Sequence, residues 1–198
     1  MIIDGLKNKK WMKYVIGLLP LLIIGSLSIV IFYYYSPDYI VNLFGVENAY
    51  ALIFITAIAG GFTTFNIIPY HILLITLAIG GLNPLLLGFL AAIGVSLGDS
   101  TSYFIGYQGR TILPEKMDKW FERVHRIGTE RPKLFMLLCF LYSCFIPESN
   151  DFITIPAGLA RLPFFNVMIP LVLGNIIFDI SLAFLAPSVY DLLQGIFF

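Results

Sequence analysis

Long apolar stretches with very few charged positions dominate this chain. Residues 14–35 are 22 consecutive uncharged residues, which form about 33 Å of helix and match the hydrocarbon thickness of a bilayer. Residues 84–108 form a second such run with Asp99 as its only charge, and residues 163–185 a third with Asp179. We therefore predict a membrane-spanning helix over each of these three ranges.

Two further apolar stretches, residues 49–80 and 134–160, are interrupted in the middle. The interruptions are Gly60-Gly61, Thr63, Thr64, Asn66 and Pro69 in the first, and Pro147-Glu148-Ser149-Asn150-Asp151 in the second. Each stretch is too short for two crossings of about 20 residues and a turn. This pattern predicts re-entrant hairpins, whose irregular backbone is shielded from lipid by protein. The first hairpin would enter from outside the membrane and the second from inside.

The remaining segments differ from these apolar runs. Residues 111–133 carry an apolar face of Met117, Trp120, Phe121, Val124 and Ile127, with charges on the other side. The pattern predicts an amphipathic helix that Gly128 ends. It lies either on the inner leaflet or as a solvated helix packed on the rest of the protein. Pro187 separates residues 188–198, which we predict to be an interfacial tail.

Composition places the whole chain, residues 1–198, in a single membrane domain. It is 59% hydrophobic and 12% charged, whereas soluble domains are about 25% charged. Eleven of the twelve Lys and Arg residues lie within residues 7–13 and 110–133. By the positive-inside rule both blocks are cytoplasmic, which predicts a multi-pass protein of the cytoplasmic (inner) membrane with its N-terminus inside. The net charge of zero argues against a nucleic-acid partner.

The two halves of the chain share spaced residues. Pro69 and Gly80 match Pro147 and Gly158 at an offset of 78, while Gly94 and Asp99 match Gly174 and Asp179 at an offset of 80. We therefore predict an all-α polytopic membrane protein with two inverted repeats. Each repeat is a re-entrant hairpin followed by a spanning helix, and an extra transmembrane helix precedes them. Inverted repeats are typical of transporters whose site lies near the bilayer midplane.

Ionisable side chains inside a membrane cost about 2.5–3.5 kcal/mol on insertion scales and are candidates for function. They are His71, Asp99, Glu148, Asp151 and Asp179. Asp99 could instead bond to nearby serines, but its recurrence as Asp179 favours function. Glu148 and Asp151 either lie in a solvated turn or cap, or take up a proton when buried.

Two further residues, His71 and Arg161, each have two possible roles. His71 is either a hydrogen-bonded packing residue or a proton carrier. Arg161, outside both basic blocks, either anchors an anionic headgroup or extends its charge to the interface. The sequence alone does not choose between them.

Signatures of soluble enzymes are absent from the sequence. It has no phosphate-binding GxxxxGK loop, no HExxH and no GxSxG, and too few His and Cys residues for a zinc site. We expect no cofactor, no metal and no enzymatic activity. The enzyme alternative is an intramembrane pair, Asp99 with Asp179, that shares one proton.

Residues 97–110, LGDSTSYFIGYQGR, resemble the GDxxxYxIGRxxGR stretch of the DedA family, also called SNARE-associated or VTT-domain membrane proteins. Residues 145–147, FIP, and Ala157-Gly158 followed by Arg161 are similar to further family motifs. The resemblance implies two facing re-entrant hairpins and translocation of lipids. The lipids are polyprenyl phosphates such as undecaprenyl phosphate in bacterial members, with proton coupling proposed, and phospholipids in eukaryotic relatives.

The chain also departs from the family. Cys144 and Asn150 stand where family members carry Arg, and Asn66 and His71 where they carry acidic residues. A divergent member has either lost the activity, relocated its charges or moved to a different lipid. The candidate residues for substrate binding or proton coupling are Asn66, His71, Asp99, Tyr103, Glu148, Asn150, Asp151, Gly158, Arg161 and Asp179.

The sequence thus predicts a lipid transporter or flippase for a phosphate-bearing lipid, either a polyprenyl phosphate or a phospholipid. The alternative is a non-transporting membrane scaffold that docks a cytoplasmic partner through residues 114–127, with Trp120 and Phe121 as anchors. A second copy of the chain is a further candidate partner, because small residues permit close helix packing. These are Gly88, Ala91, Ala92 and Gly98.

Overall fold

The computed structural model describes residues 39, 42–43, 45–62, 70–109, 118–146 and 149–197. Within these ranges the regular secondary structure is entirely helical, which confirms the all-α prediction. The predicted helix over residues 14–35 lies outside the described residues, as do Asn66 and Glu148.

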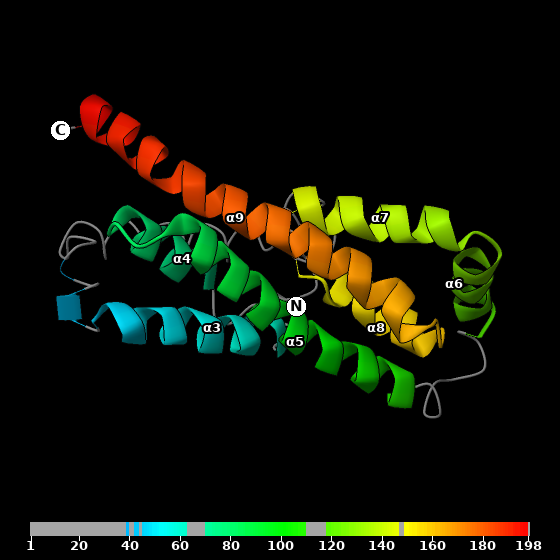
Figure 1. Cartoon of the computed structure of the whole chain (residues 1–198). Helices are drawn as coiled ribbons and strands as arrows, with labels where there is room; N and C mark the ends of the chain where they lie inside the picture. The colour runs from blue at the N-terminus through cyan, green and yellow to red at the C-terminus, as the bar shows by residue number, and fades with distance from the viewer. Residues whose placement is uncertain are drawn as a thin grey trace, which may run out of the picture.

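Seven helices are described (Figure 1). They are α3 (Val46–Phe62), α4 (Tyr70–Ile79), α5 (Pro84–Gly109), α6 (Asp118–Glu130), α7 (Pro132–Phe145), α8 (Asp151–Leu159) and α9 (Phe164–Phe197). Two of them are long and apolar enough to cross a membrane: α5 over its whole length, and α9 over Phe164–Leu192. The coarse prediction of membrane-spanning helices therefore has support in α5 and α9.

Local signals in the sequence explain where α5 begins. The Asn83 side chain accepts hydrogen bonds from the backbone N–H groups of Leu85, at 3.0 Å, and Leu86, at 3.2 Å. Pro84 is the first helical residue, where its missing N–H would have had no intrahelical partner. This is an N-terminal cap of the kind that Asn provides.

Each interrupted stretch forms two helices that run in opposite directions (Figure 1). The beginning of α3 meets the end of α4, because the backbone N–H of Asn83 donates to the Tyr50 hydroxyl at 2.9 Å. In the second stretch, Phe135 near the start of α7 packs against the core that holds Ala160 and Leu162, just beyond α8. The interruption at residues 63–69 lies outside the described residues.

The helices enclose two apolar cores. One is built by α3, α4, the first half of α5 and the C-terminal half of α9. The other is built by α7, α8, the second half of α5 and the first half of α9. The two long helices run side by side through both cores (Figure 1). They approach closely at Gly88, where a Cβ atom would lie 2.5 Å from the Cα of Ile180.

The same turn closes α4 and α8. In the first turn, Gly81 N–H donates to Ala78 O and Leu82 N–H to Leu77 O; in the second, Arg161 N–H donates to Gly158 O and Leu162 N–H to Ala157 O. This bond pair defines the Schellman motif, which needs a left-handed residue after the helix. Gly81 has φ +84° and Arg161 has φ +52°. The two turns are 80 residues apart, the spacing that also relates Asp99 to Asp179.

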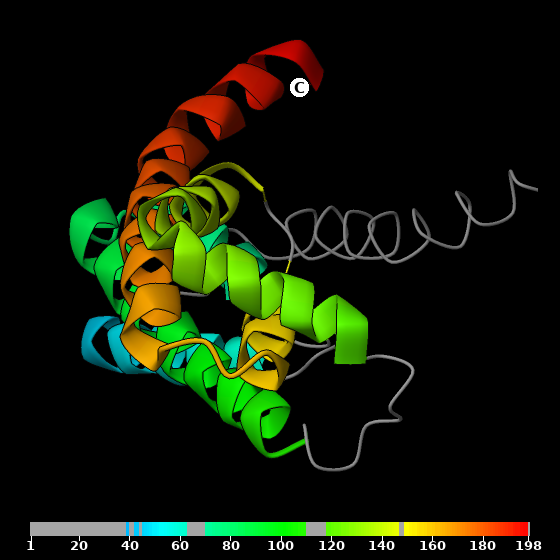
Figure 2. The same ribbon diagram turned by 90° about the vertical axis from the view of Figure 1, so that its right-hand side faces the viewer.

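The predicted separate tail after Pro187 is wrong, since α9 continues through this residue to Phe197. Proline removes one intrahelical hydrogen bond but its fixed φ is compatible with a helix, and apolar residues continue on both sides. Pro170 lies inside the same helix. The C-terminal end of α9 projects away from the other described helices (Figures 1 and 2).

The prediction that Gly128 ends the amphipathic helix is also wrong, because α6 continues to Glu130. Gly128 instead provides room for packing: a Cβ there would lie 2.5 Å from a methyl carbon of Leu162. Phe121 is only 3% exposed and is therefore poorly placed to anchor a partner. The Trp120 side chain lies outside the described part of the chain.

The stripe of small residues on α5 faces the interior of the chain. Gly88, Ala91, Ala92 and Gly98 are all buried. A Cβ on Gly98 would lie 2.4 Å from the backbone oxygen of Ile58 in α3. These residues hold helices of the same chain together and are not available for packing against a second copy.

Candidate functional site

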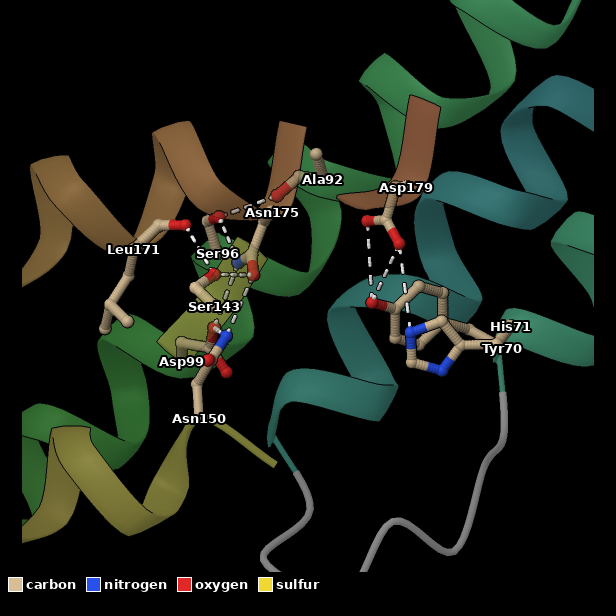
Figure 3. Close-up of polar contacts among 10 residues, drawn as sticks. All are labelled: Tyr70, His71, Ala92, Ser96, Asp99, Ser143, Asn150, Leu171, Asn175 and Asp179. Atoms are coloured by element: carbon tan, nitrogen blue, oxygen red, sulfur yellow. Dashed lines mark hydrogen bonds and ion pairs between the residues drawn. The ribbon is translucent and has the colours of Figure 1, made fainter. Parts of the chain in front are cut away.

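A buried polar cluster surrounds Asp99 in the middle of α5 (Figure 3). The Asn150 side-chain amide donates to Asp99 Oδ2 at 2.7 Å and to Asn175 Oδ1 at 3.1 Å. Asn175, on α9, donates to Ser96 Oγ at 3.0 Å and approaches Asp99 Oδ2 at 3.5 Å. Ser143 of α7 donates to the backbone oxygen of Leu171 at 2.9 Å and also bonds to Asn175. Three helices, α5, α7 and α9, and the α7–α8 connection therefore meet at this cluster through their side chains.

A second polar cluster surrounds Asp179 on α9 (Figure 3). The Tyr70 hydroxyl donates to its carboxylate, at 3.3 Å from Oδ1 and 3.5 Å from Oδ2. His71 Nε2 lies 3.8 Å from Asp179 Oδ1, and the His71 ring contacts Phe178 edge-on, with 5.6 Å between centroids. The hydrogen-bond partner of this buried carboxylate therefore comes from the first residue of α4.

The two clusters are related by the repeat spacing. Asn150 and Tyr70 are 80 residues apart, and each lies at the start of the second arm of a hairpin. Asp99 and Asp179 are also 80 residues apart. Each aspartate is bound by the hairpin of the opposite half of the chain: Asp99 by Asn150, and Asp179 by Tyr70. The two halves therefore exchange equivalent contacts.

The carboxylates of Asp99 and Asp179 have separate partners. Among the described residues no hydrogen bond joins them, and Figure 3 shows them in two distinct groups. A pair of catalytic carboxylates that shares one proton needs direct contact between the two groups. The geometry therefore gives no support to the aspartate-pair enzyme.

Three other predicted residues make contacts that hold helices together or lie at the protein surface. The Tyr103 hydroxyl donates to the backbone oxygen of Leu162 and ties α5 to the α8–α9 turn. Gly158 lets α8 approach α5, because a Cβ there would lie 2.1 Å from Tyr103 O. Arg161 is exposed and its guanidinium carbon lies 5.4 Å from the centroid of the Tyr107 ring. None of these three contacts either aspartate cluster.

The structure decides between the alternatives for Asp151 only in part. It is 5% exposed, so it does not lie in a solvated turn. Neither carboxylate oxygen has a hydrogen-bond partner, so it does not cap α8 either. The burial agrees with the second alternative, a buried carboxylate, and a buried polar group without a partner calls for a specific cause.

Sequence reasoning identified Asn150 but missed the other neutral members of the clusters. Tyr70, Ser96, Ser143 and Asn175 were not among the predicted site residues, because apart from positions in the family motifs only ionisable residues were taken as costly in a membrane. Asn175 carried a usable signal: it is an amide inside a long apolar run, four residues before Asp179 and thus on the same helix face. A buried amide also needs partners.

An apolar groove of about 420 Å³ lies between α5 and α9 and reaches the Asp99 cluster. Its wall includes Leu97, Ser100, Phe165, Ile169 and Leu173. The aliphatic and aromatic members of this set are exposed on the protein surface. Ser96 also lines the groove and receives the Asn175 hydrogen bond. The groove therefore joins an exposed apolar surface to a buried polar cluster.

No family model, curated protein or solved structure matches this chain. Of the residues that resemble the DedA motifs, the GDxxxY stretch lies within α5 and Ala157-Gly158 within α8. Because no match assigns a family or a function, the functional argument depends on the geometry of the two aspartate clusters.

Replacing Tyr70 by Phe should reduce the free energy of unfolding by about 1–3 kcal/mol, because the buried Asp179 carboxylate loses its hydroxyl donor. Tyr107 is an exposed tyrosine on α5, and Tyr107→Phe is the matched control, with an expected change within about 0.5 kcal/mol. Chemical denaturation of both variants in detergent measures the difference. Equal losses would show that the Tyr70 hydroxyl does not stabilise the Asp179 cluster.

Proposed function

We propose that this protein is a transporter that moves a phosphate-bearing lipid, a polyprenyl phosphate or a phospholipid, across the cytoplasmic membrane. In this proposal the two halves are inverted repeats, and α5 and α9 are their spanning helices. The chain is then a divergent relative of the DedA proteins.

The observation that carries the proposal is the exchange of contacts between the halves. Each long helix carries a buried aspartate, and the broken hairpin of the other half supplies its hydrogen-bond donor. Transporters built from inverted repeats place their sites at such repeat interfaces, between interrupted helices. Two equivalent contacts that break in turn would open the site alternately to the two sides.

The groove between α5 and α9 supports an amphiphilic substrate. Its exposed apolar wall suits a hydrocarbon chain, while Ser96 and the Asn175 amide next to it offer polar groups to a headgroup. A lipid could thus keep its tail in the bilayer while its headgroup passes the polar cluster.

The charge distribution supports the proposed orientation. Arg123, Arg126, Arg131 and Lys133 are exposed on α6 and the start of α7. Helix α6 and the start of α7 lie at one end of the described helices (Figure 1). By the positive-inside rule this end faces the cytoplasm, and an anionic leaflet surface attracts such a cluster.

The deciding experiment follows transbilayer movement of a fluorescent polyprenyl phosphate in proteoliposomes, with a fluorescent phospholipid in parallel. A quencher added outside reports the lipid that remains inside, and vesicles without protein provide the background. We expect faster loss of the protected pool for at least one of the two lipids.

Selective movement of the polyprenyl phosphate would identify a carrier translocase, and equal movement of both lipids a scramblase. If neither lipid moves faster than in empty vesicles, although the protein is folded by circular dichroism, the transporter proposal is wrong.

A further inference from the structure

Asp151 presents an ionisable group that the contacts described so far do not use. The first N–H groups of α8 would be the usual partners of a carboxylate at this position. They are already taken: Asp151 N–H donates to Ser149 Oγ, Phe152 N–H to Ser149 O, and the N–H groups of Ile153 and Thr154 to Asn150 O. The buried Asp151 carboxylate therefore has no local donor.

Two hydroxyl groups nearby are in the same situation. Thr154 is 0% exposed and Ser102 is 1% exposed, and neither hydroxyl oxygen has a hydrogen-bond partner. Buried polar atoms without partners are rare in folded proteins and call for a specific cause.

The packing of α8 on α5 brings these groups to the same level. Asn150 bonds to Asp99 just before α8 begins. Further along, Ile155 O lies 2.4 Å from where a Gly106 Cβ would be. The two helices therefore run in parallel, and the start of α8, with Asp151 and Thr154, lies level with Ser102.

The neighbouring carboxylate adds charge to this place. Asp151 lies close enough to Asp99 for the two carboxylates to repel each other. Asp99 Oδ2 receives the Asn150 and Asn175 amides. Oxygen ligands with surplus negative charge thus meet in a place that water hardly reaches.

We propose that Asp151, Thr154 and Ser102, together with Asp99, bind a small monovalent cation, sodium, between α5 and α8. Carboxylate and hydroxyl oxygens are the ligands that hard cations prefer. One cation supplies a partner to all three unpaired side chains and offsets the repulsion between the two aspartates, whereas a proton on Asp151 would serve only one oxygen. The side chains offer fewer oxygens than the six to eight that Ca²⁺ takes.

This inference rests on the proposed function and names its coupling ion. An anionic headgroup that passes the Asp99 cluster meets the negative charges of Asp99 and Asp151, which a bound cation reduces. The ligands come from opposite halves, Ser102 and Asp99 from α5 and the other two from α8. Sodium therefore stabilises the arrangement in which these halves are in contact, and its release would favour separation.

The test measures thermal unfolding of the purified, full-length protein in detergent, at one pH and one ionic strength, in NaCl, KCl or choline chloride. We expect saturating NaCl to raise Tm by about 5 °C relative to choline chloride. Asp151→Asn should need at least about tenfold more NaCl for the same shift. Asp191, an exposed aspartate on α9, provides the control Asp191→Asn, which should keep the wild-type response.

A second variant, Thr154→Val, tests the site independently in case Asp151→Asn does not fold. It preserves the shape of the side chain and removes an unpaired buried hydroxyl. Its Tm in choline chloride should therefore equal or exceed that of the wild type, while its response to NaCl weakens. A purely structural threonine would leave the NaCl response unchanged, which would contradict the proposal.

The outcomes separate this site from the transport proposal. Sodium-specific stabilisation that Asp151→Asn weakens supports the site even if no lipid moves in proteoliposomes. Lipid movement without any effect of sodium on Tm would overturn the sodium site but leave the transport proposal standing.

Discussion

Replacing Asp99 or Asp179 by asparagine is expected to slow lipid translocation at least about tenfold. Asparagine keeps the shape of the side chain but leaves one acceptor oxygen in place of two where Asn150 donates in one half and Tyr70 in the other. The amide NH2 that replaces a carboxyl oxygen cannot accept a hydrogen bond. Each substitution therefore weakens one of the two equivalent contacts between the halves and biases the protein toward one of its two conformations.

The rate of fluorescent lipid movement in proteoliposomes measures the effect, normalised to the amount of folded protein. Asp191→Asn is the control, because Asp191 is exposed near the end of α9 and takes no part in either cluster. Wild-type rates in both Asp99→Asn and Asp179→Asn would remove the aspartates from the mechanism. A strong effect of only one would show that the halves are not functionally equivalent.

Replacing Gly158 by alanine is expected to destabilise the protein by about 3 kcal/mol, at the upper end for overpacked cores. A Cβ at this position would lie 2.1 Å from Tyr103 O and 2.8 Å from Tyr107 N. Both are backbone atoms, so no side chain can turn aside to make room. Tm in detergent should fall by about 6–12 °C for a chain of this size.

Gly109→Ala is the matched control for this substitution. Gly109 ends α5 in the same region of the structure, and its nearest atom would be a Leu159 methyl group at 3.6 Å, an ordinary contact distance. Since alanine has the higher helix propensity, we expect an unchanged or slightly higher Tm. Equal losses in the two variants would mean that α8 does not pack on α5 as described.

Sequence analysis predicted helix boundaries correctly where they depend on interactions within one turn. Asn83 and Pro84 mark the start of α5 because a cap and a proline act within one helical turn. Pro187 and Gly128 were interpreted by the same local rules and gave wrong helix ends. Packing decides in these cases: α9 continues through its proline, and Gly128 lies against Leu162.

The candidate site could be predicted only in part, for a different reason. Asp99 and Asp179 are detectable because a carboxylate in an apolar run is costly anywhere along it. Tyr70 and Asn175 are neutral, and what gives them a role is contact with residues far away in the sequence. No periodicity or motif in one helix reports which hairpin its aspartate will meet.

The exchange of contacts between the halves has a consequence for how the protein is made. Tyr70 and its acceptor Asp179 are 109 residues apart, and ribosomes add about 5–20 residues per second. Tyr70 is therefore synthesised roughly 5–20 s before Asp179 exists. Asp99 likewise waits for Asn150, 51 residues later. The nascent first half holds incomplete polar contacts throughout this interval, and neither half is finished until the ribosome has completed the last helix.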